Sequence, residues 1–204
     1  MQVKNYINDL FTVLEKLEFS NKQGELIDFE QGTQQIMTLF SGLYISDSKL
    51  IFIGNGGSAA IASHMAIDYW KNGGIPALCF NDGAQLTCLS NDYGYDAVFE
   101  KPIQVFARPG DILIAISSSG QSSNILKGVE AAIRVGCKTI TFSGFSPLNP
   151  LRKQGDINIY SASHEYGFVE LTHQLVLHMI LDLMCAGGKE NANERSTEQS
   201  SISG

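Results

Sequence analysis

The chain has 204 residues, of which 44% are hydrophobic and 17% are charged, enough for one sizeable core but not for two ordinary domains. Its formal net charge of −7 argues against a nucleic acid or an anionic membrane as the main partner, because both attract clustered Lys and Arg. No window of about 18 residues is apolar throughout, and Asp9 stands where a signal peptide would be apolar. Composition thus predicts one cytoplasmic domain that binds neither nucleic acid nor membrane.

Residues 1–48 carry apolar side chains at intervals of three and four, the spacing of a helix with one apolar face. The two stripes consist of Ile7, Leu10, Phe11 and Leu14, and of Ile36, Leu39, Phe40 and Leu43. The spacing predicts two helices before any sheet begins.

From Lys49 the pattern changes to short β-rich runs, each followed by a turn and then by helical spacing. The runs are LIFIG, PALCF, DILIAIS, KTITFSG and DINIYS, starting at residues 50, 76, 111, 138 and 156. This alternation predicts an α/β fold, a three-layer α/β/α sandwich around a five-stranded parallel sheet. Ligands bind at the carboxyl ends of such strands, so we expect the functional loops after Ile53, Phe80, Ile116 and Phe142.

The end of the chain divides into an apolar and a polar part. Residues 169–185 have the spacing of a last amphipathic helix, whereas residues 187–204 are polar and almost free of apolar side chains. We therefore predict one domain over 1–186 and a disordered tail over 187–204. The four cysteines, Cys79, Cys88, Cys137 and Cys185, lack C-x-x-C spacing, and we expect all four to be free.

Two loops have the composition of an anion-binding site. Asn55, Gly56, Gly57 and Ser58 follow one strand and open a helix, whose N-terminus offers unpaired N–H groups. The Ser117–Ser119 run and Ser122 follow another strand and supply hydroxyl donors ahead of the next helix. A Gly-rich turn alone is also explained by tight-turn chemistry, but three consecutive serines at a buried strand end favour a ligand. Neither loop is a Walker or dinucleotide loop, which argues against nucleotides.

These motifs together resemble the SIS (sugar isomerase) domain of phosphoheptose isomerases. The resemblance rests on GNGGS, the following helix with His64, NDYGY, RPGD before an apolar strand, and S-x-SG-x-S, in this order between about Leu50 and Met184. It implies a flavodoxin-like SIS domain that converts sedoheptulose 7-phosphate to glycero-manno-heptose 7-phosphate through an enediol, for lipopolysaccharide or capsule heptose synthesis. It also implies a homotetramer with sites at subunit contacts.

The resemblance assigns the phosphosugar contacts residue by residue. It implies contacts from both loops, with Ser58 also capping its helix, and from the Asn-Asp pair of NDYGY; taken alone, that pair is more often a turn or a helix cap. The implied substrate-binding set is Asn55, Gly56, Gly57, Ser58, Asn91, Asp92, Ser117, Ser118, Ser119, Ser122 and Glu170.

The implied chemical centre contains His64 and Asp68, four residues apart on one helix face, although such a pair can also be an ordinary surface ion pair. The last helix adds Glu170 and His178, and His64, Asp68, Glu170 and His178 form the implied metal set, with zinc as the expected ion. We expect Asp68 as base, His178 as acid and Glu170 as substitute base. His173 is expected to support the site or an interface.

Eight residues separate Glu170 from His178, about 12 Å of helix rise. Either Glu170 lies off the helix start, or the two residues act in different subunits' sites. The chain also departs from the family pattern, since Asp68 stands for its Glu, Glu170 for its usual Gln, and Ile67 for a commonly acidic residue. Two alternatives therefore stay open: a non-catalytic phosphosugar-binding regulator or adaptor, and an isomerase of another phosphosugar.

Overall fold

The computed structural model describes the chain from residue 2 to residue 202, and the side chains from residue 2 to residue 187. Its centre is one sheet with the strand order β2-β1-β7-β6-β5-β3-β4. Five neighbouring strands run parallel: β3 (Leu50–Gly54), β4 (Ala77–Cys79), β5 (Ile112–Ser117), β6 (Lys138–Ser143) and β7 (Ile157–Tyr160). They coincide with the five β-rich runs of the sequence, which confirms the predicted parallel sheet.

The sheet has two strands more than predicted. Within the N-terminal segment predicted to be helical, β1 (Glu18–Asn21) and β2 (Leu26–Ile27) form a hairpin, and β1 pairs antiparallel with β7. Gly24, with φ +82°, lies in the turn between them, a conformation that glycine adopts without steric cost. Phe19 is almost fully buried, so the hairpin covers the β7 edge and adds to the core.

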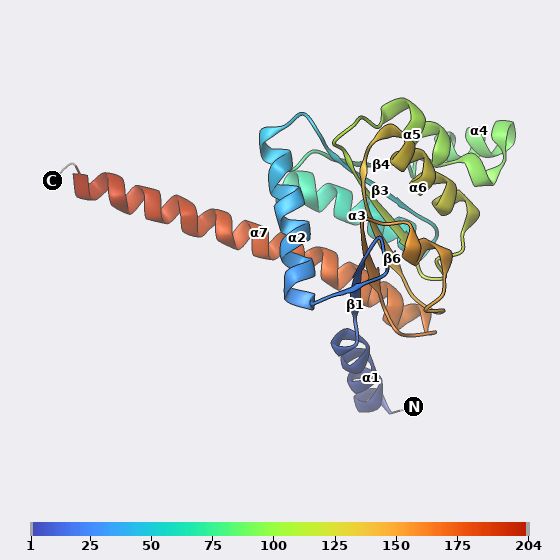
Figure 1. Ribbon diagram of the computed structural model, residues 1–204, viewed down its shortest axis with the longest axis horizontal. Coiled ribbons are helices and arrows are strands. Elements are labelled where there is room, and N and C mark those ends of the chain that lie inside the picture. The colour runs from blue at the N-terminus through green and yellow to red at the C-terminus, as the bar shows by residue number, and fades with distance from the viewer. Residues whose placement is uncertain (1, 203–204) are drawn as a thin grey trace.

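Helices cover both faces of the sheet, as Figure 1 shows. One face carries α2 (Phe29–Ser41), α3 (Gly57–Lys71) and the first part of α7 (Tyr166–Ile202), packed on Leu50 and Phe52. The other carries α5 (Glu100–Phe106) and α6 (Ser123–Val135), packed on Ile51 and Ile53. Successive side chains of β3 point to opposite faces, so a strand that is apolar throughout serves both cores.

The remaining helices lie at the periphery. They are α1 (Val3–Glu15), α4 (Gly83–Tyr93) and three short 3₁₀ helices, η1 (Gly42–Ile45), η2 (Tyr95–Ala97) and η3 (Pro150–Lys153). The predicted α1 stripe is present, but Ile7 and Phe11 are about 60% exposed and Val13 is the one buried residue of that helix. Within one chain, most of the apolar face of α1 stays uncovered.

Helix α7 starts at Tyr166 and runs to Ile202, and so it is longer than the predicted 169–185. The side chains of 188–204, nearly all of the segment expected to be disordered, lie outside the described part, and that expectation stays a prediction. Residues 166–187 are long and apolar enough to cross a membrane by length and composition alone. Half of the window that meets this test is buried in the molecule, and a core helix on a sheet meets it equally.

The order of the parallel strands determines where the site lies. After β3 the chain crosses to β4 on one side of it, and after β4 it returns past β3 to β5 on the other. The strand order therefore reverses between β3 and β5, the point where open α/β sheets bind ligands. The Gly-rich loop follows β3 and the serine loop follows β5.

Candidate functional site

The Gly-rich loop turns sharply from β3 into α3. Gly56 is the N-cap of α3, with φ +54° and ψ −121°, a conformation that favours glycine. A side chain at Gly57 would have its Cβ 2.4 Å from Glu170 Oε1, so the Glu170 carboxylate lies directly over this residue. Ser58 is buried in the first turn and makes no capping hydrogen bond, which corrects the expected cap.

The serine loop is held by its own hydrogen bonds. Ser117 Oγ accepts from the N–H of Gly120 at 3.2 Å and lies 3.4 Å from Ser122 Oγ. Ser119 Oγ accepts from the N–H of Gln121 at 3.3 Å. Ser118 is 5% exposed, and its buried hydroxyl has no hydrogen-bond partner among the described residues. A buried hydroxyl without a partner is costly, and a ligand at this loop would supply that partner.

Both loops open on one cavity of about 230 Å³. It brings together nine of the residues expected from the sequence and adds Tyr166 from the start of α7. The lining consists of Asn55, Gly56, Gly57, Ser58, Ser117, Ser118, Ser119, Ser122, Tyr166 and Glu170. None of these lining residues is Lys or Arg, so an anion would be held by hydroxyls, an amide and the N-termini of α3 and α6.

The Asn-Asp pair lies elsewhere. Asn91 and Asp92 are exposed near the C-terminal end of α4, and the Asn91 side chain donates to Asp92 Oδ1 at 2.9 Å. Neither residue lines the cavity. The structure of one chain therefore does not bring this pair to the other expected substrate contacts.

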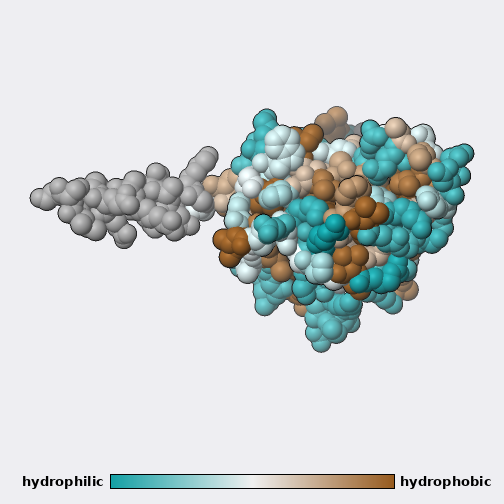
Figure 2. All heavy atoms as spheres, turned by 90° about the horizontal axis from the view of Figure 1, so that it is seen from above, coloured by the Kyte–Doolittle hydropathy of each residue, from teal (hydrophilic) through white to brown (hydrophobic). Residues whose placement is uncertain are grey.

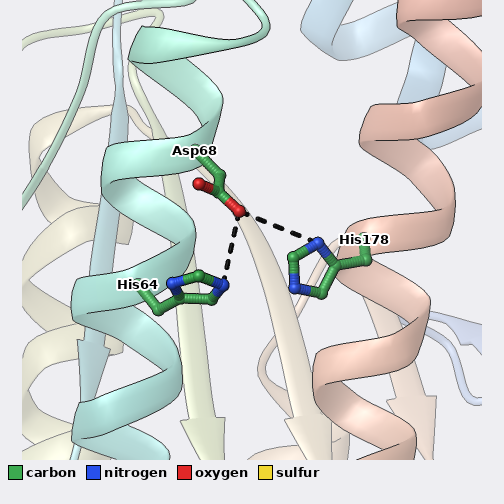
Figure 3. Close-up of side chains that lie close together, drawn as sticks. All are labelled: His64, Asp68 and His178. Carbon is green, nitrogen blue, oxygen red and sulfur yellow. Dashed lines mark ion pairs between the residues drawn. The ribbon is translucent and has the colours of Figure 1, made fainter.

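A second cluster lies between α3 and α7 (Figure 3). His64 Nε2 is 3.3 Å from Asp68 Oδ2, and His178 Nδ1 is 3.8 Å from the same oxygen. One ligand atom from each of the three side chains lies within 4.8 Å of the others. The side chains of His64 and His178 are 50% and 35% exposed, whereas that of Asp68 is 18% exposed. Two imidazoles and a carboxylate at this spacing could hold a metal ion and leave one coordination position open.

Glu170 is the member of the expected metal set that this cluster lacks. It lies within α7, which begins four residues earlier, so the idea that it lies off the helix start is wrong. Its carboxylate is at Gly57, in the cavity. Within one chain, Glu170 therefore lies beside the two loops, whereas His178 lies beside His64 and Asp68.

His173, which also belongs to α7, has a different environment. His173 is fully buried, its Nε2 lies 3.1 Å from the carbonyl oxygen of Ser143, and its ring packs at 5.5 Å on Phe142. Burial lowers the pKa of His173 to about 4, against the smaller opposite effect of that hydrogen bond. It is therefore neutral at pH 7 and supports the junction of β6 and α7 rather than an interface.

Sequence reasoning missed three residues that belong to this region. Tyr166 lines the cavity, and Tyr95 and Asn124 hydrogen-bond to Asn55. Tyr95 stands in the recognised motif NDYGY, whereas Asn124 stands two residues after Ser122, just past the serine motif. Their partners, however, come from segments 40 and 69 residues away, which no local pattern shows.

Comparison with known proteins agrees with this geometry. The model of the SIS domain family matches residues 30–144. A probable phosphoheptose isomerase of Thermoplasma volcanium is 33% identical over 184 residues, which cover 86% of this chain and 91% of that protein. The chain belongs to the phosphoheptose isomerase family of SIS-domain proteins.

Two further relatives support the assignment. A phosphoheptose isomerase of Yersinia pestis is 35% identical over 157 residues, covering 74% of this chain and 81% of that protein. The structure of the phosphoheptose isomerase from Neisseria gonorrhoeae superimposes with a TM-score of 0.75 at 27% identity, covering 89% of this chain and 97% of that one. The match thus extends over the fold that carries both the cavity and the His64, Asp68 and His178 cluster.

Proposed function

We propose that the protein is an aldose–ketose isomerase that converts sedoheptulose 7-phosphate to glycero-manno-heptose 7-phosphate in the cytoplasm. The observation that carries the proposal is the pairing of two sites that follow each other along α3 and α7. The cavity lies at Gly57 and Glu170, and the acid–base cluster lies at His64 and His178. Seven residues of α3 separate Gly57 from His64, about 10 Å of helix rise. A seven-carbon sugar with its phosphate at one end and its carbonyl at the other suits such a separation.

In this proposal the loops bind the phosphate end. The exposed N–H groups of two helix starts and the serine hydroxyls donate to phosphate oxygens, and Ser118 finds the partner that it lacks. The carboxylate of Glu170 in the same cavity is a contact for a sugar hydroxyl rather than for the phosphate, because two anionic groups repel each other. Phosphate recognition by neutral donors also explains how a chain of net charge −7 binds an anion.

The proton transfers belong to the cluster. Asp68 takes the proton from C1 of the ketose, and the resulting enediol accepts a proton at C2 to give the aldose. His178 donates a proton to the carbonyl oxygen at C2, and the hydroxyl at C1 loses one in the same overall step. Its Nδ1 faces Asp68 and its Nε2 is left for the substrate, so the carboxylate also orients the ring.

The same donor set fits zinc. His64, Asp68 and His178 would hold the ion, and the bound ion would polarise the sugar carbonyl. Participation of Glu170 in the metal set, or as a substitute base, would require a second copy of the chain, since its own carboxylate lies over Gly57.

We further propose a homotetramer. Figure 2 shows hydrophobic residues exposed among the hydrophilic residues of the surface. An apolar groove of about 450 Å³ runs between α1 and α7, lined by Leu10, Leu14, Leu171, Gln174, Leu175 and His178. Since this groove adjoins His178, a neighbouring chain seated in it would also enclose the acid–base cluster. The four cysteines are free, in agreement with a reducing compartment.

The proposal is tested by turnover. Wild-type protein, Asp68→Asn and the control Asp47→Asn are incubated with sedoheptulose 7-phosphate, aldose formation is followed by NMR, and metal content is measured on the same samples. We expect turnover by wild type and control and a fall of about 10²-fold or more in Asp68→Asn, because the base is lost. Asp47 is exposed and belongs to neither the cavity lining nor the cluster of His64, Asp68 and His178, so Asp47→Asn controls for the change in charge. Saturable binding without turnover by wild type would overturn the isomerase and favour a phosphosugar-binding protein.

A further inference from the structure

The structure shows an amide network that joins the two phosphate loops and rests on Tyr95. Asn55 follows β3, and Asn124 lies in the first turn of α6, just after the serine loop. The Asn124 Nδ2 donates to Asn55 Oδ1 at 2.8 Å, and the Asn55 Nδ2 donates to Asn124 Oδ1 at 2.9 Å. The Tyr95 hydroxyl donates to the same Asn55 Oδ1 at 3.0 Å. Two loops and the NDYGY segment therefore meet at one side chain.

A backbone group fixes the direction of these bonds. The N–H of Ile125 donates to Asn124 Oδ1 at 3.0 Å, and a backbone N–H can only donate. This atom of Asn124 must therefore be the oxygen, which also accepts from Asn55 Nδ2, and the Asn124 nitrogen must be the atom that contacts the other end of the Asn55 amide. Asn55 in turn must direct its oxygen to that nitrogen, so neither amide can be flipped without losing its bonds. Asn124 is 3% exposed, and such a loss would leave buried polar groups without partners.

This assignment determines what Asn55 offers to a ligand. Its carbonyl oxygen already accepts two hydrogen bonds, from Asn124 and Tyr95, which uses both lone pairs. Its nitrogen gives one hydrogen to Asn124 and keeps one. Because Asn55 lines the cavity, it presents a donor there and no free acceptor. A phosphate oxygen accepts hydrogen bonds, so this polarity suits the phosphosugar and disfavours ligands that need an acceptor.

We propose that Tyr95 is a positioning residue for phosphosugar binding, acting by holding Asn55 as a donor toward the cavity. The proposal rests on the proposed function, since it takes a phosphosugar as the ligand of the cavity. It also gives the NDYGY segment a role that does not need Asn91 or Asp92, which lie outside the cavity. Tyr95 itself does not line the cavity, so its effect passes through Asn55.

The test compares Tyr95→Phe with Tyr93→Phe. Both tyrosines are about equally exposed, at 55% and 57%, and each variant loses one hydroxyl. Among the described residues the Tyr93 hydroxyl makes no hydrogen bond, and its ring, which packs under Lys101 Nζ at 4.8 Å, is kept as Phe. The measurements are calorimetric affinity for sedoheptulose 7-phosphate, KM and kcat, the melting temperature, and the side-chain amide signals of Asn55 and Asn124 in NMR spectra.

For Tyr95→Phe we expect affinity and KM to weaken by about 3- to 10-fold, the worth of one neutral hydrogen bond, with kcat and melting temperature close to wild type. The Asn55 amide signals should shift without ligand, and Tyr93→Phe should match wild type throughout. Unchanged KM and unchanged Asn55 signals in Tyr95→Phe would overturn the proposal, as would a lowered melting temperature that accounts for the loss. Failure of the wild type to bind the sugar phosphate would refute the proposed function instead.

Discussion

The two faces of α7 place the same type of side chain in opposite environments. His173 lies on the face against the sheet, among Val169, Thr172, Val176 and Leu177, and is fully buried. His178 lies five residues later on the other face, is 35% exposed, and adjoins Asp68 of α3. Five residues correspond to a rotation of about 140° beyond one full helical turn, so the two imidazoles point in different directions and have different neighbours.

This difference shows that the environment of a histidine, not its residue type, decides whether its ring is enclosed in the core or open to solvent and to a carboxylate. The buried His173 is held neutral by desolvation, and its Nδ1 has no hydrogen-bond partner among the described residues. The side chain of His178 is 35% exposed and lies 3.8 Å from a carboxylate oxygen of Asp68, so its ring reaches both solvent and a charged group. The exposed face also carries Leu171, Leu175 and Leu183, each 47% exposed, so it combines an accessible imidazole with uncovered apolar surface.

The largest expected effect is that of His178→Ala on turnover. Loss of a general acid should lower kcat by about 10²- to 10⁴-fold. Affinity for the sugar phosphate should stay near that of wild type, because the cavity lies two helical turns away along α7. Steady-state kinetics and calorimetry on the same preparation separate the two quantities.

The matched control is His164→Ala, since His164 is exposed and stacks on Phe145 at 6.0 Å, away from the cluster. It should leave kcat unchanged. A kcat of His178→Ala within a few-fold of wild type would exclude His178 as the acid and move the proton transfers to other residues.

The second prediction concerns the apolar surface beside His178. Leu175→Glu keeps a good helix former but puts a charge into the groove between α1 and α7. If this groove is a subunit contact, burial of an unpaired charge should weaken association by about 10²-fold or more. Light scattering after size exclusion should then show a smaller species than wild type.

Leu148→Glu is the control for Leu175→Glu, because Leu148 is 78% exposed in the loop that follows β6. Its assembly size should equal that of wild type. A wild-type protein that is monomeric at all concentrations would refute the homotetramer and leave the α1 and α7 faces without an assigned partner.

The sequence predicted the parallel sheet because its strands are buried on both faces and read as continuous apolar runs. It predicted the cavity for a similar reason, since glycines and serines directly after such strands are local signals. The β1–β2 hairpin was not predicted, because β1 is short and its pairing with β7 joins residues well over 100 positions apart.

Long-range contacts also explain what was missed at the site. The i,i+4 spacing of His64 and Asp68 is local, but their meeting with His178 depends on how α3 packs against α7. The eight-residue spacing of Glu170 and His178 correctly indicated that one chain does not unite them. The network of Asn55, Tyr95 and Asn124 left no sequence signal, because an amide's orientation is set by partners from three segments.

Among these α7 variants the smallest effect is expected for His173→Gln, which tests the buried face. The pKa of His173 is about 4 in the folded chain and about 6.5 when unfolded, so between these values the unfolded state binds a proton that the folded state does not. Folding stability present above pH 6.5 is therefore lost as the pH falls toward 4, by up to about 1.4 kcal/mol per pH unit. Gln cannot titrate, yet its amide can still donate to the Ser143 carbonyl oxygen.

The pH-dependent loss of folding stability is measured by denaturant unfolding at pH 7 and at pH 5, at one fixed protein concentration. Wild type should lose about 2 kcal/mol more between the two pH values than His173→Gln, whatever the variant's stability at pH 7. His164→Gln removes an exposed histidine and should follow the wild-type pH dependence. Parallel curves for wild type and His173→Gln would mean that His173 is protonated in the folded chain, and the contrast between the two faces of α7 would then rest on exposure alone.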